Sequence, residues 1–285
     1  MDQCLKNKID TRAIGLDISL SLARWLTGSE HLHYGLWAEL EPCAANLGAA
    51  QEAYTTHLLG QLPKGKLRIL DIGGGAGETA ARLGQLGHEV DIIIPSSRLA
   101  ARCRENAPQA KVHEMRFEDY SGEGPFDLCL FSESFQYIPL AQGLSRCVEM
   151  LAPGGHIIVA DCFRSGDRPS EARAVGGGHE ITRFWAQVES LPLDVLLRED
   201  LTDQVAPSID IESGFLRIFG EALVRIDEEL ALKKPLIRRV LETLWRVSVN
   251  RRRRESIQRR LMAEGRSSEV FRACNRYLLV KMQKT

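Results

Sequence analysis

The chain has 285 residues, 44% of them hydrophobic, and a formal net charge of −1 at pH 7. The length suits one large domain or a domain with a cap, and the near-zero charge argues against general nucleic-acid binding. We find no apolar run of the ~20 residues that a membrane span needs and no signal-peptide core. The seven cysteines are scattered without a CxxC pair, which indicates neither a zinc site nor a disulfide framework and favours a reduced, cytoplasmic protein.

From residue 67 onward, apolar runs of strand length alternate with helix-like segments, which favours an α/β fold with a parallel sheet. The patterns predict strands at 67–72, 90–94, 112–116, 126–131, 156–161, 193–198 and 277–282. They predict helices at 78–83, 99–105, 140–151 and 181–190, and mainly helical structure over 209–272. We expect residues 1–60 to form an N-terminal helical lid and residues 61–285 the main domain, with 209–272 as a helical cap insertion.

A glycine-rich turn follows the first predicted strand. Asp71 ends the strand, and Gly73, Gly74, Gly75 and Gly77 precede a helical stretch. Glycine permits positive φ and close approach of a ligand, and the helix N-terminus aims free N–H groups at the same place. Open α/β sheets bind ligands at the carboxyl ends of their strands. Because the acid precedes the glycines instead of following by about 20 residues, the pattern differs from a dinucleotide fingerprint.

The loop DIGGGAG at 71–77 resembles the (D/E)xGxGxG loop of class I S-adenosylmethionine (SAM)-dependent methyltransferases. Further matches follow in the family's order: FDLCLF at 126–131 and LAPGG at 151–155. HYGLW at 33–37 and DLTDQVAP at 200–207 resemble segments of the branch that methylates quinones, tocopherols and sugar-bearing natural products. The resemblance implies a Rossmann-like sheet, parallel with an antiparallel last strand, flanked by helices and roofed by a helical cap. It also implies methyl transfer from SAM to a small molecule, lipid-like or carrier-bound.

The same resemblance implies a set of cofactor-binding residues: Asp71, Gly73, Gly75, Gly77, Ser96, Tyr34, Glu118 and Ser132. The chain departs from the family at the end of the second strand, where Ile94 replaces the acid that usually binds the ribose hydroxyls. A carboxylate there makes a charge-assisted hydrogen bond of about 1.5–3 kcal/mol, which isoleucine cannot replace. Ser96 and Ser97 are candidates to hold the ribose instead.

Methyl transfer needs a positioned nucleophile and, in some cases, a group that removes its proton. Glu133 directly follows the fourth predicted strand in ESFQY, which resembles the family's ESxxH with Tyr137 in the histidine position. His179 follows three glycines and has a suitable intrinsic pKa. We take Glu133, His179 and Tyr137 as catalytic candidates. The alternatives are a helix-start acid for Glu133, cap packing for Tyr137 and a solvated helix-start histidine for His179.

Asp161 and Arg164 end the fifth predicted strand, and each is a candidate to line the pocket. A turn-forming acid is an equally good interpretation of Asp161. His31 and His33 have no third metal ligand nearby, so we predict no metal site and place them in the HYGLW segment.

Residues 233–260 form a basic tract in which Leu236, Val240, Leu244 and Val247 recur at helical spacing. One interpretation is a helix packed on the core with a solvated basic face. The other is a helix that lies on an anionic membrane or contacts an acidic carrier protein, which would make the protein peripheral at the membrane. Two other functions stay open: a SAM-fold protein that binds or scaffolds without methylating, and an RNA methyltransferase, against which the absence of an NPPY motif counts.

Overall fold

A computed structural model describes residues 11–122, 124–166, 174–262 and 265–285, with only the backbone for residues 11–14, 256 and 260. Within these ranges a seven-stranded sheet has the order β3-β2-β1-β4-β5-β7-β6. Strand β7 is antiparallel to β5 and β6, and the other pairs are parallel. The strands are β1 Arg68–Ile72, β2 Glu89–Ile93, β3 Lys111–His113, β4 Phe126–Ser132, β5 Leu151–Arg164, β6 Leu193–Asp200 and β7 Asn275–Lys284.

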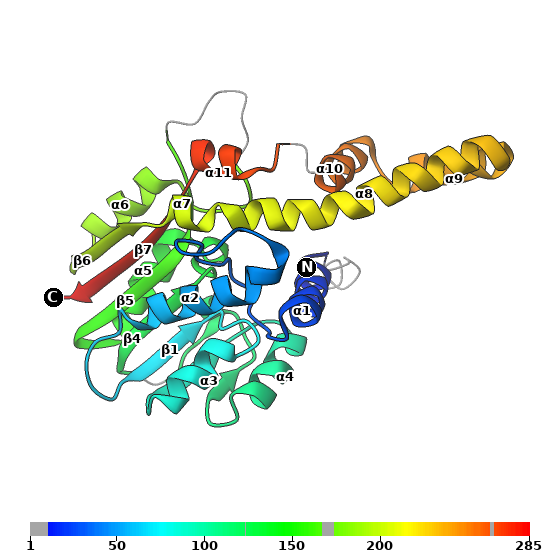
Figure 1. Cartoon of the computed structure of the whole chain (residues 1–285). Helices are drawn as coiled ribbons and strands as arrows, with labels where there is room; N and C mark the ends of the chain where they lie inside the picture. Colours follow the sequence, from blue (N-terminus) through cyan, green and yellow to red (C-terminus); the bar gives the residue numbers. More distant parts are fainter. Residues whose placement is uncertain (1–10, 123, 167–173, 263–264) are drawn as a thin grey trace, which may run out of the picture.

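Helices flank this sheet and extend beyond it (Figure 1). The first group comprises α1 Thr11–Thr27, α2 Leu47–Leu59, α3 Glu78–Gln85, α4 Ser97–Asn106, α5 Leu140–Met150 and α6 Ile181–Glu189. The second comprises α7 Thr202–Val205, α8 Pro207–Lys233, α9 Pro235–Ser248, α10 Arg251–Leu261 and α11 Ser268–Cys274. Short 3-10 turns lie at Ala44–Asn46, Phe117–Asp119 and Phe135–Tyr137. No helix in the described ranges has the length and hydropathy of a membrane span.

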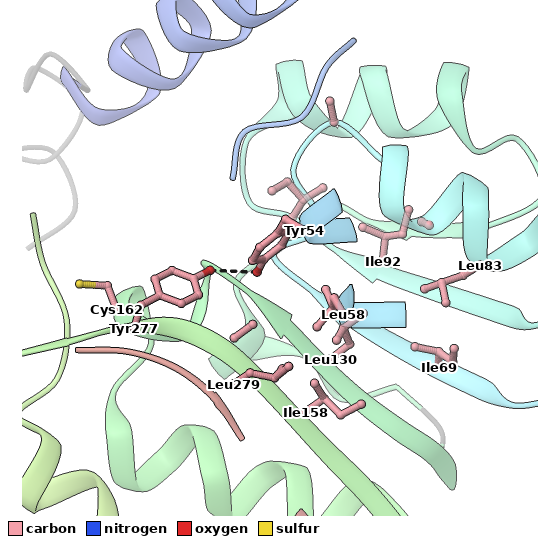
Figure 2. Packing of buried hydrophobic residues seen from close by; sticks show 14 of the residues in the cluster. Tyr54, Leu58, Ile69, Leu83, Ile92, Leu130, Ile158, Cys162, Tyr277 and Leu279 are labelled. Carbon is pink, nitrogen blue, oxygen red and sulfur yellow. Dashed lines mark hydrogen bonds between the residues drawn. The ribbon is translucent and has the colours of Figure 1, made fainter. Parts of the chain in front are cut away.

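The core has two halves because successive strand residues point to opposite faces of the sheet. On one face Ile69 and Leu130 pack with Leu83 of α3 and with Tyr54 and Leu58 of α2 (Figure 2). The other face buries a second cluster beneath α5 and α6, which includes Leu70, Phe131, Ile157, Leu144 and Phe184. Both faces of β1, β4 and β5 are therefore buried, which explains their nearly unbroken apolar runs.

The predicted fold class is confirmed: a parallel sheet with one antiparallel strand, flanked by helices. Element ends differ locally. Strand β5 begins at Leu151, earlier than predicted, because Leu151 pairs with Phe126 while His156 pairs with Leu128. The LAPGG turn thus forms a bulge within the strand, in which Gly154 has φ +72°.

The first 60 residues divide into parts with different surroundings. Helix α2 belongs to the core, since Ala50, Tyr54 and Leu58 are buried within it. Residues 28–43, which we call the crossing segment, instead extend to α7, where the backbone N–H of Trp37 donates to the carbonyl of Gln204 at 2.9 Å. The helical lid predicted for residues 1–60 stays a prediction.

The end of α8 together with α9 and α10 forms a projection, which we call the arm and define as residues 221–260 (Figure 1). Its base is close-packed, because a Cβ on Gly220 would lie 2.5 Å from the carbonyl oxygen of Leu261. Helix α9 lies against α8, where Arg238 bonds Asp227 at 2.8 and 2.9 Å. Our first interpretation of the basic tract, a helix packed on the core, is wrong. Every residue of the stripe Leu236, Val240, Leu244 and Val247 is more than half exposed.

Candidate functional site

The glycines after β1 serve different purposes. A Cβ on Gly73 would lie 2.4 Å from Cβ of Ser134, and one on Gly77 would lie 2.9 Å from Cα of Cys103. Those two positions allow neighbouring elements to approach closely. A Cβ on Gly75 would meet nothing nearer than Leu32 Cδ1 at 3.9 Å. All three have positive φ, so the chain makes this turn at little cost only with glycine. Gly75 is thus the glycine whose backbone faces open space.

Asp71 lies beneath this loop with 1% of its surface exposed. Its Oδ2 atom is buried and has no hydrogen-bond partner among the described residues. Burial raises the pKa of Asp71 to about 7. A buried carboxylate oxygen without a donor is costly, so it marks a position where a ligand N–H or ammonium would be stabilised.

Ile94, the position at which the ribose-binding acid is missing, directly follows β2. Ile94 is buried and its backbone N–H donates to the carbonyl of His113 at 3.1 Å, so it supplies no polar side chain. Ser96 is the N-cap of α4, where its Oγ accepts from the backbone N–H of Leu99 at 3.4 Å. Glu118 lies in the short turn after β3 and is partly exposed. These residues remain predicted cofactor ligands.

The crossing segment is fixed over the glycine loop by a buried ion pair. Glu30 accepts from Arg102 Nε at 2.9 Å and Nη2 at 2.8 Å, and from Asn106 Nδ2 at 2.8 Å. Burial alone raises the pKa of Glu30, but the bonds from Arg102 and Asn106 outweigh it and hold the pKa below its ordinary value. The segment thereby places Leu32 beside Gly75 and brings Tyr34 to the end of β4.

Trp37 of the same segment packs inside the protein. Its side chain is 4% exposed, and its Nε1 donates to Ser208 Oγ at 2.8 Å. The backbone N–H of Gly35 donates to the same oxygen at 3.0 Å. Trp37 therefore joins the crossing segment to the start of α8, a packing role that leaves Tyr34 as the segment's candidate contact with a ligand.

Glu133 stands out at the carboxyl end of β4. Among the described residues it is the only non-glycine residue with positive φ, at 55°. Such a conformation costs of order 1–3 kcal/mol and points to a functional constraint. Burial raises the pKa of Glu133 to about 8. Its Oε1 accepts from the Tyr34 N–H at 2.8 Å and from the Tyr277 hydroxyl at 2.9 Å.

A chain of hydroxyl groups leads away from Glu133, and the sequence analysis missed it. The Tyr277 and Tyr54 hydroxyl oxygens lie 2.9 Å apart (Figure 2). The Tyr54 hydroxyl oxygen also lies 3.1 Å from Ser132 Oγ. Burial raises the pKa of both tyrosines well above the ordinary value, so both stay protonated. Neither residue belongs to a recognisable motif. The only signal available was that both residues are aromatic.

The remaining candidates are fixed by backbone contacts. Asp161, 1% exposed, accepts from the N–H groups of Gln136 at 3.0 Å and Cys162 at 2.7 Å, and burial raises its pKa to about 7. Asp161 lies within β5, where it pairs with Leu278 of β7, so the turn-forming interpretation is wrong. His179 Nε2 lies 3.2 and 2.9 Å from the carbonyls of Phe135 and Ile138, so it must be the protonated nitrogen. Only Nδ1 is left for base chemistry.

Tyr137 and the histidine pair complete the candidates. Tyr137 is 50% exposed, next to the turn that His179 fixes. His31 and His33 lie 3.1 Å apart through their ring nitrogens, and burial lowers the pKa of His33 to about 3, which keeps it neutral. Within the described ranges no group of three or more His, Cys, Asp or Glu side chains is placed to hold a metal ion.

Part of the chain matches a known protein family. Residues 69–155, which run from β1 through the glycine loop and Glu133 to the β5 bulge, match the family model described as a methyltransferase domain. Over 129 residues the chain is 30% identical to the tRNA 5-carboxymethoxyuridine methyltransferase of Escherichia coli (strain K12), covering 42% of this chain and 44% of that protein. Over 113 residues it is 31% identical to the ubiquinone biosynthesis O-methyltransferase of Caulobacter sp. (strain K31), covering 37% and 45%. The chain thus spans less than half the length of these relatives.

Solved structures extend the likeness to nearly the whole chain. A geranyl diphosphate methyltransferase in complex with GPP and sinefungin superposes with a TM-score of 0.65 over 94% of both chains, at 15% identity. The [4+2]-cyclase SpnF superposes with a TM-score of 0.64 over 95% of this chain and 94% of that one, at 16% identity. At these identities the likeness concerns the fold.

The observed strand order, the glycine loop and the matched domain agree with one another, and methyltransferases are among the relatives. The chain contains a methyltransferase domain over residues 69–155 and has the fold of the class I SAM-dependent methyltransferases.

Proposed function

We propose that this protein transfers a methyl group from SAM to a small-molecule acceptor. The observation that supports this most directly is Glu133, a strained, partly buried acid at the carboxyl end of β4 within the matched domain. The ubiquinone O-methyltransferase relative and the geranyl diphosphate methyltransferase fold neighbour both act on small molecules by their names. We extend that substrate class to this chain, with a lipid-like or carrier-bound acceptor.

The residues present fit SAM at the glycine loop. The exposed backbone at Gly75 provides space for a ligand, and the orphaned Asp71 Oδ2 provides an acceptor for an ammonium group. Tyr34, Ser96, Glu118 and Ser132 are the further residues proposed to hold it. When bound, SAM supplies a methyl group on a positively charged sulfonium, so no activation of the electrophile is required from the protein.

The chain's own task is then to orient the acceptor and to take up its proton. Glu133 has both described hydrogen bonds on Oε1, and no partner of Oε2 is found among the described residues. We propose that Oε2, as the carboxylate, accepts the proton of the acceptor group. A pKa near the working pH suits a general base. Burial raises the pKa of Glu133 above neutral pH, and a nearby cation would lower it again toward neutral pH. The Tyr34 N–H and the Tyr277 hydroxyl hold the carboxylate in place.

The test combines SAM-binding calorimetry with transfer of tritiated methyl groups to a metabolite extract. We expect the wild-type protein to bind SAM and to label a small-molecule fraction. We expect Glu133→Gln to bind SAM similarly and to label at least about tenfold less. The exposed Glu114→Gln is the surface control and should change neither result. Absence of SAM binding by the wild-type protein would contradict the proposal.

A second candidate is a SAM-fold protein that binds its ligand without methylating it. The departure at Ile94 and the tyrosine at position 137 favour it, and one neighbour of this fold is named a [4+2]-cyclase. SAM binding without any transfer to the extract would support this candidate. A third candidate is methylation of RNA, because one of the relatives is a tRNA methyltransferase. Labelled RNA in the same extract would support this candidate.

A further inference from the structure

The charge of this protein is divided unevenly between residues 233–260, the basic tract within the arm, and the rest of the chain. Residues 233–260 contain 11 Lys and Arg residues and only two acids, Glu242 and Glu255, which gives this tract a net charge of +9. Since the whole chain carries −1, the remaining residues carry −10. Such an asymmetry favours an anionic partner at the arm and disfavours one at the rest of the surface.

Several of these cations are not neutralised within the protein. Arg238, Arg246 and Arg251 pair with Asp227, Glu242 and Glu255. No acidic partner is found within the described part of the chain for Arg239, Arg252 and Arg253. These three arginines are exposed, so their charge is available to a partner.

The arm also exposes large apolar side chains. On α9 the exposed fractions of Leu236 and Val247 are 73% and 81%, and Leu232 at the hairpin tip is 79% exposed. At 100° per residue, Leu236, Val247, Val240 and Leu244 lie within an 80° stripe, while Arg239 lies 60° from Leu236. Trp245 and Ile237, outside the stripe, are about half covered. The helix thus directs an apolar stripe, with a cation beside it, away from α8.

From this pattern we propose that the arm binds the surface of an anionic lipid bilayer, with the stripe of α9 inserted among the lipids. An exposed apolar stripe flanked by cations is the pattern of helices that lie in a membrane interface. RNA would pair with the arginines but would leave Leu236 and Val247 in water. Because membrane binding needs neither SAM nor an acceptor, this inference goes beyond the proposed function and can fail independently of it.

The experiment measures sedimentation of the full-length protein with vesicles of equal parts phosphatidylglycerol and phosphatidylcholine, and with vesicles of phosphatidylcholine alone. We expect binding to the anionic vesicles that weakens as salt is raised, and at least about tenfold weaker binding to the neutral ones. Neutralising Arg239, Arg252 and Arg253 to glutamine should weaken anionic binding by roughly fivefold per residue. Substituting Leu236, Val240 and Val247 with glutamine should abolish it at any charge density.

The matched control replaces exposed apolar residues of the sheet domain with glutamine: Leu86, Val195 and Leu196. It should bind vesicles like the wild type, and circular dichroism should show every variant folded. Equal binding to neutral vesicles, or none to anionic ones, would overturn the proposal. So would tighter binding to tRNA in a gel shift that the stripe variant leaves intact. The proposal would also fail if the wild type formed a dimer in sedimentation velocity, the stripe variant were a monomer, and neither bound vesicles. In that case the arm would bind a second copy of the chain.

Discussion

The sheet domain and the arm contain similar amphipathic sequence, but the structure places them differently. In α3 the apolar residues Ala80 and Leu83 are fully buried against the sheet. In α9, a helix with an equally clear apolar stripe, no residue is buried. The difference shows that amphipathic spacing predicts a helix and a face, while the partner of that face is decided by what the chain places beside it. For α3 the partner is the sheet, whereas the stripe of α9 is left exposed, and we propose a lipid bilayer as its partner.

The largest expected effect concerns the glycine loop of the sheet domain. Gly75→Val should lower SAM affinity by at least about 100-fold, because a branched side chain would occupy the open space where the cofactor is proposed to lie. Since Gly75 has φ +56°, part of any loss could come from backbone strain. Gly87→Val is the matched control, since Gly87 has φ +90° with nothing within 4 Å of a Cβ. Calorimetry measures the SAM affinity of both folded variants. Unchanged affinity in Gly75→Val would contradict the proposal that SAM lies against Gly75.

The second prediction separates the two regions by pH. Burial raises the pKa values of Asp71 and Asp161 to about 7 and of Glu133 to about 8, all in the sheet domain. A carboxyl whose folded pKa is raised stabilises the fold below its unfolded pKa, and that stability is lost as pH rises through the folded pKa. The free energy of unfolding should therefore fall by about 2–3 kcal/mol between pH 6.5 and 8, or roughly 5–10 °C in Tm.

This window avoids the opposing effect of His33, whose pKa burial lowers to about 3 and which destabilises the fold only as pH falls below about 6.5. Denaturant unfolding across the window is the measurement. Asp161→Asn should flatten the slope, whereas Asp227→Asn in the arm, where Arg238 lowers the pKa of Asp227, should leave it unchanged. A stability that rises with pH would contradict the burial of these acids as neutral groups.

A smaller effect is expected from the network around Glu133. Glu133→Gln should lower single-turnover methyl transfer at least tenfold, on the order of 1.4 kcal/mol, with SAM affinity little altered. The amide keeps an oxygen for the Tyr34 N–H and the Tyr277 hydroxyl, so the fold should persist. Tyr277→Phe should reduce transfer less, because it removes one bond to the carboxylate while keeping the ring. Wild-type turnover in Glu133→Gln would move the role to His179 or leave the reaction to proximity.

The smallest effect is expected from removing the arm. Replacing residues 221–260 with a short Gly/Ser linker should change the free energy of unfolding by less than about 1 kcal/mol, because the segment buries little and its ends meet at Gly220 and Leu261. Thermal unfolding provides the measurement, and the vesicle binding proposed above should be lost with the arm. A drop in Tm of more than a few degrees would mean that the arm supports the sheet domain.

Much of the site was predictable because its signals are local in sequence. A strand followed by Asp71 and closely spaced glycines specifies a turn whose conformation only glycine accepts cheaply, and the structure has that turn. Glu133 was predicted as a catalytic candidate because it directly follows a strand, and the end of the apolar run marks the end of that strand. The sheet class followed similarly from alternating strand and helix patterns.

Contacts between distant residues could not be predicted in this way. Tyr54 and Tyr277 are 223 positions apart and meet only because α2 packs across the sheet onto β7. Tertiary packing likewise decides that Trp37 bonds Ser208 and that Glu30 pairs with Arg102. The exposure of the α9 stripe was likewise decided by tertiary structure, since spacing alone is identical for a buried and an exposed face. The sequence by itself determined the elements and the glycine loop, through local backbone preferences and apolar periodicity. The partners of Glu133 and the freedom of the arm arose from how those elements pack.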